Sequence, residues 1–144
     1  MVVTFCGHKD VYDGERVKEK LTQLVDQLVA SGADTFYLGG YGGFDSLAAR
    51  VVKNLKESYP HIKSVLILPY LDRPYDETLY DESMYPPLEV VPKRYAILRR
   101  NQWMVDQADI VVAYVNHGWG GAAQTFEYAK KDKKQIINLG NYEG

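Results

Sequence analysis

The chain is poor in cysteine, with Cys6 as the single cysteine among 144 residues. One cysteine excludes an internal disulfide and any zinc site built from several thiolates. The sequence also lacks an apolar run approaching the roughly 20 residues that span a bilayer as a helix. It opens directly into a strand-like run at residues 2–6, without a basic and apolar leader. These absences predict a cytoplasmic protein with no membrane contact.

The chain also lacks a strong excess of either charge, because its formal net charge is -2 at pH 7. Non-specific nucleic-acid binding normally requires a strongly basic face, so the composition argues against nucleic acid as a partner. The histidines His8, His61 and His117 lie far apart without the spacing of metal ligands. We therefore expect neither a metal site nor a cofactor.

The apolar pattern alternates between short strand-like runs and helical spacing, which is typical of βαβ units. Five strands are expected, at residues 2–6, 35–38, 62–68, 110–115 and 135–139. Strands this apolar are covered on both faces, so the sheet should be mainly parallel. The sequence thus predicts one Rossmann-like, doubly wound, three-layer α/β domain over residues 1–144.

Residues 70–93 interrupt this alternation between the third strand and the next helix. The segment is rich in tyrosines and prolines, among them Tyr75, Tyr80, Pro74 and Pro87. Prolines exclude a long helix there, and so long a connection is uncommon unless it is a lid or a contact surface. The segment is therefore either a variable surface excursion or a lid or subunit contact, for which amphipathic tyrosines are well suited.

Right-handed crossovers bring the loops after the first, second and fourth strands to the carboxyl edge of the sheet, where α/β sheets bind ligands. The first loop carries Gly7, His8 and Lys9, and the last two of these can meet an anion. A phosphatase with Cys6 as nucleophile needs an arginine six residues later. That position is Tyr12, which excludes the phosphatase.

The second loop is glycine-rich and ends close to Asp45. Its glycines, Gly39, Gly40, Gly42 and Gly43, let the backbone approach a ligand without interference from Cβ atoms. The free N–H groups of the helix that follows favour an anion such as phosphate. Asp45 is then either the N-cap of that helix or the acceptor of a ribose hydroxyl.

The third loop, residues 117–121, precedes another helix and supplies Gly120 and Gly121. Thr125 is placed either to donate its hydroxyl to a phosphate or to cap the helix. Glu127, in the next turn, is either a site residue or a solvated acid. Before the fourth strand, Arg100 can point into the pocket, although helix geometry alone favours a solvated position.

Two of these segments resemble the SLOG superfamily, a Rossmann-like group that includes the LOG phosphoribohydrolases and the DNA-processing protein DprA. LOG enzymes read approximately R-K-A-x-M-x-x-x-A-D before the fourth strand, and Arg100, Met104, Ala108 and Asp109 match this pattern. Asn101 stands in place of the lysine.

After the strand, LOG enzymes read P-G-G-x-G-T-x-x-E, and Gly121 and Thr125 match in spacing. Gln124 replaces the last motif glycine, and Tyr128 occupies the position of the catalytic glutamate, one residue after Glu127. The resemblance is therefore closer to the superfamily than to the enzyme.

The resemblance implies a nucleotide or nucleotide-sugar ligand, such as a nucleoside monophosphate, ADP-ribose or an NAD-like molecule, bound by a sensor or regulatory module. One alternative is an N-glycosidic phosphoribohydrolase with Glu127 and Arg100 as the catalytic pair. Another is a partner-binding protein that uses residues 70–93. Oligomers are common among the resembled proteins, so a homo-oligomer formed through Trp103 and the tyrosine-rich segment is expected.

Overall fold

A computed structural model describes residues 1–88 and 91–144. Residues 89 and 90, which belong to the predicted 70–93 excursion, lie outside the described residues. The strands are β1 (Val2–Gly7), β2 (Thr35–Leu38), β3 (Lys63–Ile67), β4 (Glu82–Met84), β5 (Ile110–Tyr114) and β6 (Gln135–Asn138). They form one sheet in the order β4-β3-β2-β1-β5-β6, and every pairing is parallel.

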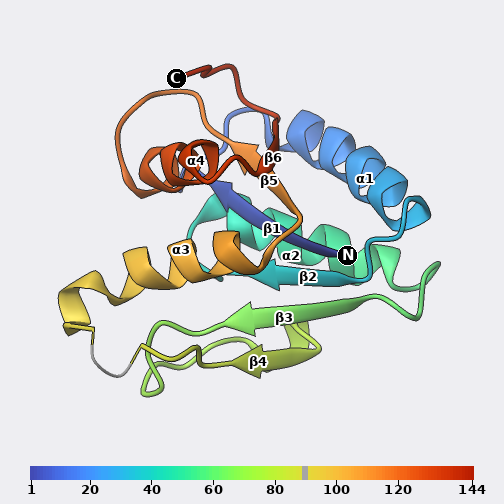
Figure 1. Cartoon of the computed structure of the whole chain (residues 1–144). Helices are drawn as coiled ribbons and strands as arrows, with labels where there is room; N and C mark the ends of the chain where they lie inside the picture. Colours follow the sequence, from blue (N-terminus) through green and yellow to red (C-terminus); the bar gives the residue numbers. More distant parts are fainter. Residues whose placement is uncertain (89–90) are drawn as a thin grey trace.

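Among the described residues, four α-helices cover this sheet: α1 (Gly14–Ala30), α2 (Gly43–Leu55), α3 (Ala96–Gln107) and α4 (Gly121–Lys131). Figure 1 shows α1 and α2 on one face and α3 and α4 on the other. The alternation of side chains along β1 explains both layers. Val3 and Phe5 belong to the core beneath α1 and α2, whereas Cys6 belongs to the core beneath α3 and α4. The predicted Rossmann-like three-layer fold is confirmed.

In the part of the chain that the structure describes, the sheet has six strands rather than the expected five, because the 70–93 excursion contributes β4. A short 3₁₀ turn, η1 (Glu77–Leu79), precedes this strand, and a second, η2 (Lys93–Tyr95), leads into α3. All three residues of β4 are exposed, and β4 pairs with β3 at the edge of the sheet. A polar edge strand of this length carries no apolar alternation, which is why the sequence pattern did not reveal it.

The strand order places the reversal of the chain between β1 and β5, which are neighbours in the sheet. The connections from β1 to β3 pass through α1 and α2 on one face of the sheet, whereas those from β4 to β6 pass through α3 and α4 on the other face (Figure 1). Loops leaving β1 and β5 therefore diverge and open a crevice at the carboxyl edge. Across residues 1–88 and 91–144, no helix combines the length and the apolarity needed to cross a membrane.

Candidate ligand-binding pocket

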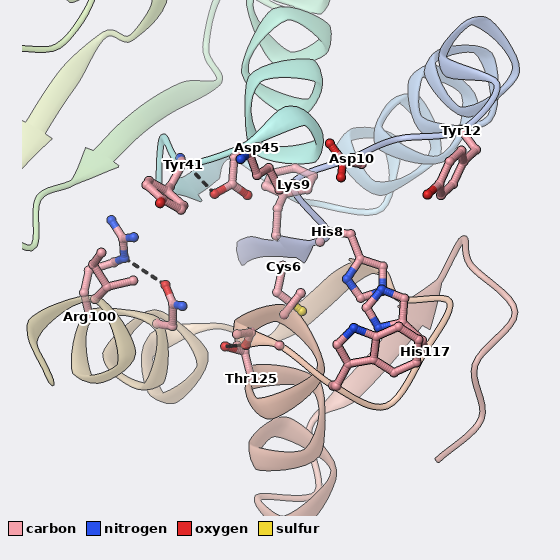
Figure 2. A pocket seen from close by; sticks show the side chains of 18 residues that line it. Cys6, His8, Lys9, Asp10, Tyr12, Tyr41, Asp45, Arg100, His117 and Thr125 are labelled. Carbon is pink, nitrogen blue, oxygen red and sulfur yellow. Dashed lines mark hydrogen bonds between the residues drawn. The ribbon is translucent and has the colours of Figure 1, made fainter.

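A cavity of about 380 Å³ lies at this reversal point. Its walls come from the end of β1, the β2–α2 loop, the first half of α3 and the start of α4 (Figure 2). The lining includes eight of the residues that the sequence predicted for the site: Gly7, His8, Lys9, Asp45, Arg100, Gly120, Gly121 and Thr125. Gly39, Gly40, Gly42, Gly43 and Glu127 are not among its lining residues.

The start of α4 forms an open floor of this cavity. Gly120 is the N-cap residue with φ 91°, and both Gly120 and Gly121 have open space where a side chain would stand. No described residue accepts a hydrogen bond from the backbone N–H of Gly121, Ala122 or Ala123. Such a helix terminus combines free donors with the positive end of the helix dipole, which favours an anion. The exposed side chain of Lys9 lines the same cavity.

The start of α2 differs, because its N–H groups are used inside the protein. Gly43 N donates to Lys9 O at 2.7 Å, and Phe44 N donates to His8 O at 3.3 Å. A Cβ at Gly43 would overlap Lys9 O, and one at Gly42 would lie 3.0 Å from Lys9 Cα. These glycines therefore let the β2–α2 loop pack against the β1–α1 loop. The anion that the sequence placed at this helix is not supported by the structure.

Asp45 lies in the first turn of α2 and is buried, with 8% of its surface exposed. It is not the N-cap, which is Gly42. Its Oδ2 accepts from Tyr41 N at 3.2 Å, whereas Oδ1 has no hydrogen-bond partner in the described part of the chain. Burial raises the pKa of Asp45 to about 6, although the nearby Arg100 and the Tyr41 N–H bond both oppose this rise.

Arg100 is 1% exposed, so the solvated position favoured by helix geometry is wrong. Its Nη1 donates to Gly39 O at 2.7 Å and to Ile67 O at 2.8 Å, and its Nε donates to Asn101 Oδ1 at 2.8 Å. Two of these bonds fix the guanidinium at the carboxyl ends of β2 and β3. Burial lowers the pKa of Arg100, and the charge of Asp45 counteracts that effect.

Thr125 lines the cavity, whereas Glu127 does not. The Thr125 hydroxyl donates to Gly121 O at 2.9 Å, a bond within its own helix, instead of pointing free to a phosphate. Glu127 is half-buried beside the carboxyl-terminal end, since a Cβ at Gly144 would lie 2.8 Å from its Oε1. Tyr128, at the position of the LOG glutamate, donates to Asp106 Oδ1 at 2.7 Å on α3.

His8 stands at the other end of the cavity and begins a stack of three rings. Its ring lies 3.8 Å from that of His117, which in turn lies 3.6 Å from that of Trp119. His8 Nε2 accepts from Asn116 N at 2.9 Å, so its proton is on Nδ1. Burial, followed by the neighbouring His117, lowers the pKa of His8. Among the described residues, no group of three or more His, Cys, Asp or Glu could hold a metal ion.

The sequence reasoning missed the aromatic residues at the cavity. Tyr12, Tyr41 and Trp119 are 73%, 64% and 70% exposed, and all three line it. The available signal was their position, since each lies in a loop at the carboxyl edge and Tyr41 and Trp119 have glycines on both sides.

A sequence profile of the YspA SLOG family matches residues 8–84, just over half of the chain. The chain is 26% identical over 141 residues to the uncharacterized SPbeta prophage-derived protein YoqJ of Bacillus subtilis (strain 168), covering 81% of each. It is also 32% identical over 57 residues to the UPF0398 protein BH1768 of Halalkalibacterium halodurans, covering 40% of this chain and 30% of that protein.

Solved structures share the fold at low sequence identity. DNA processing protein A from Helicobacter pylori has a TM-score of 0.69 at 19% identity, with 99% of this chain and 66% of that chain covered. The structure of TM1055 has a TM-score of 0.66 at 18% identity, with 94% of this chain and 71% of that chain covered. DprA from Streptococcus pneumoniae has a TM-score of 0.68 at 17% identity. The match covers 94% of this chain but only 49% of the DprA chain.

These structures correct one prediction. The composition argued against nucleic acid, yet the same fold occurs in the H. pylori protein, which has a described single-stranded DNA binding mode. The expectation against nucleic acid as a partner is therefore wrong. The prediction was wrong because it used net charge. Net charge gives no information about whether cations and aromatic rings lie together at one edge of the protein.

Proposed function

Because the chain belongs to the YspA SLOG family, we propose that its pocket binds a nucleotide-type ligand and that the protein acts as a sensor or regulatory module. The ligand is a nucleoside monophosphate, ADP-ribose or an NAD-like molecule. The cavity of about 380 Å³ lies within the usual range for small-molecule sites.

The observation that carries this proposal is the difference between the two helix starts. The first N–H groups of α2 donate to Lys9 O and His8 O, whereas those of α4 have no acceptor among the described residues and open onto the cavity. A phosphate placed on Gly121 and Ala122 would accept these bonds. The Lys9 ammonium would supply a second, charged contact.

Asp45 adds the requirement for a donor on the ligand. Its Oδ1 is buried without a partner, and such an atom costs free energy unless a donor reaches it. A ribose hydroxyl is a donor of suitable chemistry, and the nearby Arg100 opposes the rise that burial causes in the pKa of Asp45. Phosphate at α4 and sugar at Asp45 together describe a nucleotide.

Thermal unfolding with AMP, NAD and ADP-ribose tests the proposal. A ligand at a hundred times its Kd should stabilise the protein by about 2.7 kcal/mol. Gly121→Asp should remove this shift, because it places a carboxylate where the phosphate would lie. Gly14→Asp is the matched control, since Gly14 also begins a helix with open space around it. No shift with any ligand would contradict the proposal.

Single-stranded DNA is a second candidate, favoured by the three exposed rings of Tyr12, Tyr41 and Trp119 around one cavity. Base stacking on aromatic rings is how many proteins hold single strands without sequence preference. Fluorescence anisotropy of a labelled oligothymidine tests it. Binding that weakens as salt rises would support this candidate, and no binding at low salt would contradict it.

The phosphoribohydrolase and partner-binding alternatives stay predictions. The position of Glu127, outside the cavity and beside Gly144, lends no support to its catalytic role. Release of adenine from AMP that is lost in Glu127→Gln would support that role nevertheless. A homo-oligomer also stays a prediction. Trp103, expected at such a surface, is half-buried and stacks on Tyr37 of β2 with 5.6 Å between ring centroids.

A further inference from the structure

We propose that Trp119 is the platform on which a nucleobase of the ligand stacks, as a fourth ring on the stack of His8, His117 and Trp119. The inference rests on the proposed function and adds which part of the ligand gives it specificity. The chemical class is a planar aromatic base that carries a phosphate, either as a free nucleotide or within a single strand.

The first support is the order of the stack. The His8 and His117 rings are inclined by 14° and the His117 and Trp119 rings by 18°, so all three are nearly parallel. His8, at the inner end, is buried and held by Asn116 N, whereas Trp119 at the outer end is 70% exposed. The stack is anchored inside the protein and ends at the solvent.

The second support is that Trp119 is held in place without being buried. Its inner face is covered by His117, which leaves its outer face without a described aromatic partner. An indole that is already stacked on another ring has less side-chain entropy to lose when a ligand binds. Covering it with a base therefore adds little ordering cost. Removing an aromatic side chain on which a base stacks typically weakens binding by roughly one to two orders of magnitude.

The third support is the distance along the chain to the anion site. Only Gly120 separates Trp119 from Gly121, the first residue of α4 with a free N–H. A base on the indole and a phosphate on the helix start would thus be bound by one continuous loop. Lys9 and Asp45 line the same cavity (Figure 2). Lys9 would contact the phosphate, and Asp45 would contact the sugar.

Isothermal titration with AMP and with ribose 5-phosphate, which lacks the base, tests the inference in the full chain. The unmodified protein should bind AMP about ten- to a hundredfold more tightly than ribose 5-phosphate. Trp119→Ala should remove this preference while retaining ribose 5-phosphate binding, and Trp119→Phe should keep most of it. Tyr95→Ala, which changes an exposed ring outside the cavity lining, should leave both affinities unchanged.

The outcomes separate the inference from the function beneath it. Equal binding of AMP and ribose 5-phosphate would overturn the inference and leave the proposed function standing, whereas binding of neither would overturn both. If Trp119→Ala fails to fold, indole fluorescence decides in a Trp103→Phe background, where Trp119 is the remaining tryptophan. Quenching by AMP but not by ribose 5-phosphate would support the inference, and no quenching would overturn it.

A final comparison identifies the source of the base. Titration with dAMP and with an eight-residue oligodeoxyadenylate should both show dependence on Trp119. Binding of the oligonucleotide at least tenfold tighter than dAMP would assign the base to a single strand. Comparable affinities would assign it to a free nucleotide. Binding of both that is unchanged by Trp119→Ala would overturn the inference.

Discussion

Asp45 and Arg100 approach each other across the backbone of Gly39 without forming a direct ion pair. A Cβ at Gly39 would lie 3.1 Å from Asp45 Oδ2 and 3.2 Å from Arg100 Cζ, so a side chain there would be in tight contact with both charged groups. The Arg100 bonds go to backbone carbonyls instead, and one carboxylate oxygen stays unpartnered within the described chain. This leaves a buried carboxylate and a fixed cation at the end of the cavity.

Asp45→Asn should stabilise the free protein at neutral pH. Because the folded pKa of Asp45 is about 6 and the ordinary value is 3.8, the unfolded chain loses its proton first as pH rises. Folding stability therefore falls between about pH 4 and pH 6 by up to about 3 kcal/mol, at about 1.4 kcal/mol per pKa unit. Urea unfolding at several pH values should show that the free energy of unfolding of Asp45→Asn rises relative to that of the original protein as pH increases through this range. An equal difference at pH 4 and pH 7 would contradict the assignment.

His8→Gln tests a titration of opposite sign. His8 has a folded pKa below 6.5, so at acid pH the unfolded state binds a proton that the folded state does not. This residue should therefore reduce stability as pH falls below about 6.5, and a glutamine, which can still accept from Asn116 N, should remove that loss. The exposed His61→Gln serves as the control. Parallel stability curves for His8→Gln and the original protein would refute the prediction.

Arg100→Met should cost about 3–5 kcal/mol, because it leaves Asp45 buried without its neighbouring cation. It also leaves the carbonyls of Gly39 and Ile67 without the Arg100 donor. Arg99→Met, on the exposed side of the same turn, should change stability by less than about 0.5 kcal/mol. Denaturant midpoints of the two variants give the comparison. Similar midpoints would mean that Arg100 contributes no buried interaction.

The two glycine-rich loops should respond differently to alanine. Gly43→Ala should destabilise the fold by about 1–3 kcal/mol, because its Cβ would overlap Lys9 O. Gly121→Ala should be tolerated, since nothing lies within 4 Å of the added carbon. Thermal unfolding of the free variants measures this contrast. A stable Gly43→Ala would show that the β1–α1 and β2–α2 loops are not tightly packed.

The sheet and the position of the cavity were predictable, because the buried strands are continuous apolar runs followed by glycine-rich loops. β4 was not, since Glu82, Ser83 and Met84 show no apolar face. Arg100 was misplaced because its acceptors, on Gly39 and Ile67, lie 61 and 33 residues away in sequence. Periodicity within one helix contains no information about carbonyls on other elements.

The glycines show a further limit. A missing Cβ permits a close approach by a ligand or by another part of the chain, and the sequence is the same in both cases. At Gly42 and Gly43 the approaching group is Lys9, whereas Gly120 and Gly121 face open space. Only the packing of the β1–α1 loop distinguishes them.

The most direct test of the central claim is a ¹H–¹⁵N spectrum of the labelled protein during titration with AMP. The account predicts that the backbone amides of Gly121 and Ala122 shift strongly, because their N–H groups receive the phosphate. The amides of Gly43 and Phe44, which already donate to Lys9 O and His8 O, should shift little. Shifts concentrated at Gly43 and Phe44, or no saturable shift at Gly121 and Ala122, would contradict it.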